Sequence, residues 1–194
     1  MCVNVCRVRS SPDNGRMNRI LRHVLVGLGM AVLMGCTPAL NWRETRLADS
    51  ALQALMPCKP DSATRTVQLP ADHRAVDATL RMQGCEASDL QFTLAQMSVP
   101  DGIAMADALS AWRAASLAAL KAQPGDVSIQ AWQLQGADAV PPPTRAEVTT
   151  STHRAQWVWF AHANRIYQAA VYGDAKASRL NEAAEVYFSG IKLP

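Results

Sequence analysis

The sequence lacks the short motifs that mark the common enzyme classes. It contains no G-x-S-x-G turn of the serine hydrolases and no glycine-rich fingerprint for binding phosphates or dinucleotides. Its histidines show neither the H-x-x-x-H nor the H-E-x-x-H spacing of paired metal ligands, and no internal repeat or low-complexity segment is present. The sequence therefore gives no signal for catalysis, and we expect neither a bound metal nor an organic cofactor.

An excess of charge of one sign is also missing from most of the chain. The 194 residues carry a formal net charge of +3, but residues 1–35 contain five arginines and one aspartate, which gives +4. Residues 36–194 contain 14 Lys and Arg and 15 Asp and Glu, so their net charge is −1. A segment without a basic bias lacks the electrostatic footprint of nucleic-acid binding and of a polybasic membrane patch. We therefore expect no nucleic acid among the partners.

The apolar run near the N-terminus is too short to span a bilayer. Val24–Met34 has 11 residues, whereas a transmembrane helix needs about 20. A basic segment, residues 19–23, precedes it, and the run ends at Gly35 and Cys36 without an A-x-A cleavage pattern. This arrangement is typical of a signal peptide, and we predict that residues 1–35 direct export.

The end of this run resembles the lipobox of bacterial lipoproteins. In Leu33-Met34-Gly35-Cys36 a small residue precedes a cysteine, as in that motif. The resemblance implies that signal peptidase II cleaves before Cys36 and that Cys36 carries the lipid that anchors the protein to a membrane. Enterobacterial lipoproteins retained in the inner membrane tend to have Asp next, where this chain has Thr37. The resemblance therefore favours the outer membrane, with the protein facing the periplasm; an uncleaved anchor and cleavage elsewhere are the alternatives.

The chain is expected to divide into a leader, a tether and one domain. Met17 by itself opens a leader of normal length, so we predict that residues 1–16 are a spurious extension; a long n-region is the alternative. Residues 36–49 are expected to form the lipidated tether. Residues 50–194 then form a single domain, because the 159 residues after position 35 are enough to build a hydrophobic core.

The cysteines predict a disulfide bond. Cys2 and Cys6 lie in the leader and Cys36 is expected to carry lipid, which leaves Cys58 and Cys85. Two remaining cysteines in an exported domain are best explained as one structural disulfide. Their spacing is not C-x-x-C, so a thioredoxin-type redox role is not favoured.

Alternating apolar and polar residues predict an antiparallel sheet. The clearest pattern covers Val76–Met82, in which every second residue is apolar. We expect Gly84 to end this strand. Parity alone places Cys85 on the polar face, and a bulge at Gly84 is the alternative that turns it inward. Further strands are expected at residues 50–56 (where a helix is the alternative), 65–69, 90–94, 127–131 and 147–150, and in a hairpin of residues 155–162 and 165–172 that turns at Ala163-Asn164.

A helical period with an apolar stripe replaces this alternation at residues 103–123 and 175–189, and a capping-box pattern at Asn41–Glu44 predicts a short helical turn. The order of these elements, together with Met56-Pro57-Cys58-Lys59-Pro60, resembles PsbP-like domains of exported proteins over residues 50–192. The resemblance implies an α+β fold in which an antiparallel sheet is packed by a long central helix and a C-terminal helix. It also implies an adaptor or binding role rather than any chemistry.

The densest aromatic cluster lies in the predicted hairpin. Trp157 and Trp159 point to one face of their strand, and Val158 and Phe160 point to the other. If helices cover both faces, all of these side chains belong to the core, which is the favoured interpretation because aromatic residues supply much of the bulk of small cores. If one face is open, Trp157, Trp159 and Tyr167 form a binding platform.

Two hypotheses for the function follow from these patterns. The first is a non-enzymatic, lipid-anchored protein of the cell envelope that binds another protein or a small ligand. The second is an envelope hydrolase or metal-dependent enzyme in which His153 or His162 meets an acidic residue. A convergent acid–histidine pocket would favour the second hypothesis, and a shallow apolar groove would favour the first.

Overall fold

The computed structural model describes residues 40–71 and 74–194, which belong to one compact unit, Pro38–Pro194. The predictions of a signal peptide, of the extension 1–16 and of lipid on Cys36 fall outside the described residues. They stay predictions.

The described residues form mostly strands. In chain order the elements are β1 (Arg43–Arg46), β2 (Gln53–Met56), β3 (Asp61–Ala71), β4 (Arg74–Ala87), β5 (Leu90–Ser98), α2 (Met105–Ala119), a short 3-10 turn η1 (Pro124–Asp126), β6 (Val127–Ala131), β7 (Thr144–Thr149), β8 (His153–His162), β9 (Arg165–Asp174) and α3 (Leu180–Ser189).

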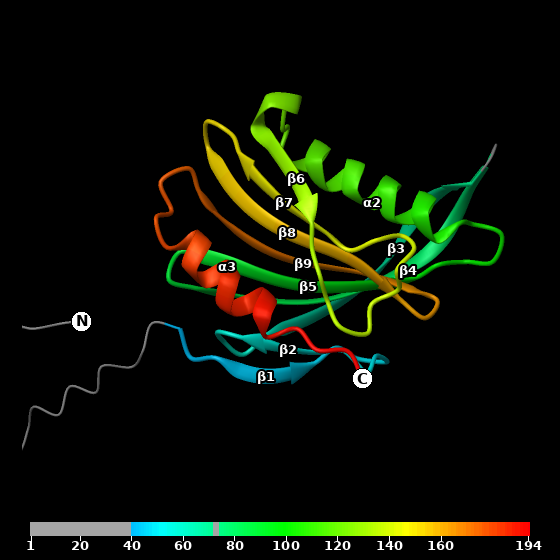
Figure 1. Cartoon of the computed structure of the whole chain (residues 1–194), viewed down its shortest axis with the longest axis horizontal. Helices are drawn as coiled ribbons and strands as arrows, with labels where there is room; N and C mark the ends of the chain where they lie inside the picture. The colour runs from blue at the N-terminus through cyan, green and yellow to red at the C-terminus, as the bar shows by residue number, and fades with distance from the viewer. Residues whose placement is uncertain (1–39, 72–73) are drawn as a thin grey trace, which may run out of the picture. The chain divides into compact units, whose positions relative to one another are not determined.

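Seven of these strands form one antiparallel sheet, and both of its faces are covered. The strand order is β3-β4-β5-β9-β8-β7-β6, whereas β1 and β2 pair in a separate two-stranded ribbon. Figure 1 shows α2 above the sheet and the ribbon below it, and α3 packs on the same face as the ribbon. The predicted α+β fold with an antiparallel sheet is therefore confirmed.

The central strands are buried on both faces. In β8, Trp157 and Trp159 point into the core under α2, whereas Val158 and Phe160 point into the core under α3, and all four side chains are fully buried. A strand covered on both sides has apolar residues at nearly every position, which explains the apolar run of β8. The sheet therefore separates two hydrophobic cores.

Both helices are shorter than the sequence predicts. The patterns predict helix over residues 103–123 and 175–189, whereas α2 has 15 residues and α3 has 10. A turn at Asp174, whose carboxylate accepts a hydrogen bond from the Lys176 N–H, takes up the residues before α3. Because α2 lies on one outer face of the sheet, the prediction of a long central helix is wrong.

Strand β4 continues through Gly84 to its end at Ala87. Gly84 pairs with Asp61 of β3 on one side and with Thr93 of β5 on the other, so the strand end expected there and the alternative of a bulge are both wrong. A Cβ atom at Gly84 would lie 2.8 Å from the carbonyl oxygen of Phe92. The glycine therefore allows a close approach of neighbouring strands and does not break the sheet.

Part of the predicted tether belongs to the fold. Residues 43–46 pair with β2 as strand β1, so the helical turn expected at Asn41–Glu44 is wrong. The preceding residue, Trp42, packs edge-on against Phe92, with ring centroids 5.8 Å apart. These contacts place the start of the folded domain before residue 50.

The predicted hairpin is confirmed. Strands β8 and β9 pair along their whole length, and the positive φ of the turn falls on Ala163, at 51°. Residues 50–56, for which a strand and a helix were both considered, contain strand β2 and no helix. The other expected strands are found as β3, β5, β6 and β7, with ends that differ by a few residues.

Candidate functional site

An apolar groove lies between α2 and the sheet; we call it the α2 groove. Side chains of β3, β4, β5 and β9 form its floor, and the C-terminal half of α2 forms its roof. Its volume is about 660 Å³, within the roughly 300–1,000 Å³ that is usual for small-molecule sites. Its dimensions and lining make it the candidate binding site.

The floor follows from the register of the strands. Leu80 lies opposite Met97, and Met82 lies opposite Ala95, whose neighbour on β9 is Gln168. From the edge strand β3 to the central strand β9 there are three interstrand spacings, or about 14 Å. Leu80 and Met82 remain partly exposed although their strand lies beneath a helix, so the groove leaves apolar surface in contact with solvent.

The roof is shallow because α2 has small residues there. Ala111, Ala114, Ala115 and Ala119 line the groove beside the larger Trp112 and Leu120, and these alanines carry no atoms beyond Cβ to fill it. Nearer the start of α2, Leu109 is fully buried against the sheet and holds the helix in place. Farther along α2, Trp112, Leu117 and Leu120 also pack against this core, so the groove lies beside these contacts.

Few polar groups line the groove. Gln168 is only 7% exposed, and its Nε2 donates a hydrogen bond to Ser116 Oγ of α2 (2.8 Å) at the inner end of the floor. The Tyr172 hydroxyl accepts a hydrogen bond from Trp157 Nε1 (3.0 Å). Burial raises the pKa of Tyr172, so this hydroxyl is neutral at neutral pH. These groups are suited to orienting a ligand and do not form an acid–base pair.

The outer end of the groove carries a positive charge. Arg65 of β3 is exposed, and its Nη2 lies 3.1 Å from Met82 Sδ. Of the described residues that line the groove, Arg65 is the charged one. Ion pairs in the described part of the chain join Arg81 to Asp49 and Arg145 to Glu185, and none involves Arg65.

A second cavity of similar volume, about 660 Å³, lies beside α3. The loop at Trp132 and Leu134 and the segment after α3 line it, together with Phe188. It also contains Glu185 and Lys192, which carry opposite charges. Its lining is therefore more polar than that of the α2 groove and less suited to an apolar ligand.

A polar cluster beneath α3 serves to hold that helix. Arg145 of β7 is buried, and its guanidinium pairs with Glu185 of α3 (2.6 Å) and donates to Gln156 of β8. Gln156 in turn donates to Asn181 at the start of α3 (3.0 Å). Each contact joins the helix to the sheet or one strand to the next, so the cluster stabilises the fold rather than presenting groups to a ligand.

The proposed platform of Trp157, Trp159 and Tyr167 does not form. Trp157 and Trp159 are 0% exposed beneath α2, and Tyr167 is 2% exposed on the opposite face of the sheet. Helices cover both faces, so the favoured interpretation, that these aromatic residues are core, is confirmed. Tyr167 stacks on Phe160, with ring centroids 5.0 Å apart.

The two histidines do not converge on one site. His153 begins β8 and His162 ends it, which places them about 30 Å apart along the strand. His153 Nδ1 shares a hydrogen bond with the Thr152 hydroxyl (2.8 Å), and His162 Nδ1 lies 2.8 Å from the carbonyl oxygen of Gly136. Within residues 40–71 and 74–194, no group of three or more His, Cys, Asp or Glu side chains is placed to hold a metal ion.

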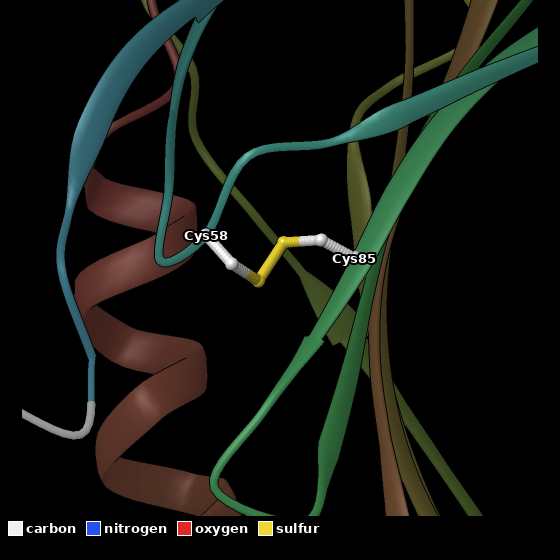
Figure 2. The surroundings of a disulfide bond; sticks show 2 residues. All are labelled: Cys58 and Cys85. Atoms are coloured by element: carbon white, nitrogen blue, oxygen red, sulfur yellow. A yellow bond between two sulfur atoms is a disulfide. The ribbon is translucent and has the colours of Figure 1, made fainter.

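The predicted disulfide joins Cys58 to Cys85. Figure 2 shows it linking the turn after β2 to strand β4, with Cα atoms 6.0 Å apart. Cys85 faces away from the α2 side of the sheet, where Ala78 and Leu80 lie, as the parity of a regular strand requires. Because the residues around Cys58 and α3 cover that face, the bond forms without a bulge.

No protein-family model matches the chain. No curated protein matches it either. Within the described part of the chain, neither helix has the length and apolar character needed to cross a membrane.

The groove residues were not identified from the sequence. The available signal was the run of alanines at 111–119 in a helix predicted to pack on a sheet, because small residues facing the apolar side chains of Val67, Leu80 and Met82 leave space between the layers. Periodicity assigns residues to a face and says nothing about the distance to the layer that covers it.

Proposed function

We propose that this chain is a non-enzymatic, lipid-anchored protein of the cell envelope whose α2 groove binds a small apolar ligand. The lipid on Cys36 anchors it to a membrane, with the outer membrane favoured, and the folded domain faces the periplasm. The observation that supports the binding role is the α2 groove, which combines partly exposed apolar side chains with few polar groups.

We further propose a PsbP-like arrangement within the α+β fold. Its support is the order of strands and helices and the turn Met56-Pro57-Cys58-Lys59-Pro60, in which Cys58 forms the disulfide. An adaptor or binding role of that kind agrees with an open groove.

The alternative, an envelope hydrolase or metal-dependent enzyme, has less support. It requires His153 or His162 to meet an acidic residue in a pocket, and the hydrogen bonds of both rings go to a hydroxyl and to a main-chain carbonyl. Neither histidine lines the α2 groove.

The anchor is tested by processing. Cys36→Ala is expected to leave an unprocessed precursor, because signal peptidase II requires the cysteine of the lipobox. The wild-type chain should accumulate as the same precursor when signal peptidase II is inhibited, and both are measured by immunoblotting of membrane fractions. Normal cleavage under both conditions would contradict the proposed anchor.

The groove is tested by filling it. Ala115 faces the groove and is exposed, so Ala115→Trp is expected to occupy the space without disturbing the core, and to reduce labelling by a neutral photoreactive alkyl probe at least fivefold. Ala118→Trp places the same side chain on the same helix outside the groove lining and serves as the matched control. Equal labelling of the two variants would exclude the groove as the binding site.

A further inference from the structure

We infer that the α2 groove binds a single-chain anionic amphiphile of the fatty-acid class, with its hydrocarbon chain beneath α2 and its carboxylate at Arg65. This inference rests on the proposed function, because it names the ligand of the same groove. It is carried by the placement of charge: an apolar floor that ends, at the edge of the sheet, in an arginine that forms no ion pair within residues 40–71 and 74–194.

The position of Arg65 fits a head group that stays in water. Burying an ionised carboxylate without a partner is very costly, so an anionic ligand must keep its head at the outer end of the groove. Arg65 is exposed on the edge strand β3, and its side chain lies against Met82 of the floor. The aliphatic stem can therefore stay on the apolar surface while the guanidinium pairs with the carboxylate in solvent.

The inner end fits an apolar chain that stops short of the centre of the sheet. Leu80, Met97, Met82 and Ala95 provide the apolar floor, and the hydrogen-bonded pair of Gln168 and Ser116 marks where it ends. The pair uses the Gln168 Nε2 donor internally, so the ligand need not supply a polar group there. From its outer to its inner end, the groove presents the positive charge of Arg65, then apolar surface, and then the hydrogen-bonded pair of Gln168 and Ser116. A ligand with one anionic end and one apolar chain matches this order.

A peptide fits the groove less well than a hydrocarbon chain. Every residue of a peptide brings an N–H and a C=O that need partners when buried. Three of the four floor strands, β4, β5 and β9, have paired neighbours on both sides, so their main-chain groups are already used in the sheet, whereas β3 lies at its edge. A hydrocarbon chain makes no such demand.

The test compares an acid with the matching alcohol on the full chain. Photoreactive, clickable hexadecanoic acid or hexadecanol is added to washed, isolated membranes that contain the protein, where the probe cannot be attached metabolically to Cys36. The half-saturating concentration is then measured for the wild type and for Arg65→Gln, Arg65→Glu and Arg43→Gln. Arg43 is an exposed arginine on the ribbon strand β1 and serves as the matched control.

We expect the acid to label the wild type at lower concentration than the alcohol does. Arg65→Gln should raise the half-saturating concentration of the acid about two- to fivefold, as expected for loss of a solvent-exposed ion pair, and Arg65→Glu should raise it further. Labelling by the alcohol should not change in either variant, which also shows that the variants are folded, and Arg43→Gln should behave as the wild type.

Two results would overturn the inference alone, and a third would overturn the proposed function. Equal half-saturation by acid and alcohol would overturn the inference and leave the groove as an apolar site. An equal loss of both probes in Arg65→Gln would overturn it too, because the arginine would then act on packing rather than on charge. Failure of both probes to label the wild type would overturn the proposed function itself.

Discussion

Cys58→Ser and Cys85→Ser are each expected to lower the free energy of unfolding by about 3–4 kcal/mol. The bond closes a loop of 28 residues, since the two cysteines are 27 positions apart, and the chain-entropy model gives about that stabilisation for such a loop. The loop contains all of β3, the edge strand that carries Arg65. The change is measured by denaturant unfolding of the purified, oxidised protein.

The double variant Cys58→Ser/Cys85→Ser is the control for this prediction. Each single substitution already removes the whole bond, so the double variant should be destabilised by about the same amount as either single one. Reduction of the wild type should reproduce the loss. Alkylation of two free thiols in the folded, periplasm-purified wild type would show that the bond is absent.

Trp157→Ala is expected to destabilise the protein by about 3–5 kcal/mol, as is usual for truncation of a buried tryptophan. Trp157 is 0% exposed, packs on Trp159 with ring centroids 5.3 Å apart, and donates a hydrogen bond to the Tyr172 hydroxyl. Truncation leaves both a cavity and a buried hydroxyl without its donor. Denaturant unfolding measures the loss.

Trp112→Ala provides the comparison for the same substitution. Trp112 lies on α2 at the groove and is only partly buried, so its truncation should cost roughly half as much or less. A loss for Trp157→Ala no larger than that for Trp112→Ala would contradict the placement of Trp157 in the core.

The central part of the fold could be predicted because its signals are local. The alternation of Trp157 and Trp159 with Val158 and Phe160 assigns side chains to the two faces of β8, and the structure keeps that assignment. The cysteine count and the predicted export of the chain gave the disulfide between Cys58 and Cys85.

The errors arise where a residue's role depends on distant neighbours. Gly84 has the character of a strand breaker, but the carbonyl of Phe92 on the adjacent strand approaches it too closely for a side chain. Asn41–Glu44 carries a helix-capping pattern, but pairing with β2 and the contact of Trp42 with Phe92 make this segment extended. In both cases long-range pairing overrides a local preference.

The candidate site could not be predicted from the sequence, because it too depends on residues that are brought together only by folding. The α2 groove exists because alanines of α2 lie opposite side chains of the consecutive strands β3, β4 and β5 and of β9, which is far from them in the chain. Each of these residues looks like an ordinary core residue when taken alone. They form a candidate site because, in the folded chain, they surround one common cavity.

The most direct test of the account is to map where a photoreactive alkyl probe attaches to the full chain in membranes. Peptide mass spectrometry of the labelled protein distinguishes the two cavities, which have about the same volume. We predict attachment at the α2 groove, within residues 65–70, 80–82, 95–97, 111–120 and 168–172. Attachment at Trp132 and Leu134, or near Phe188, would place the ligand in the cavity beside α3 and contradict the central claim.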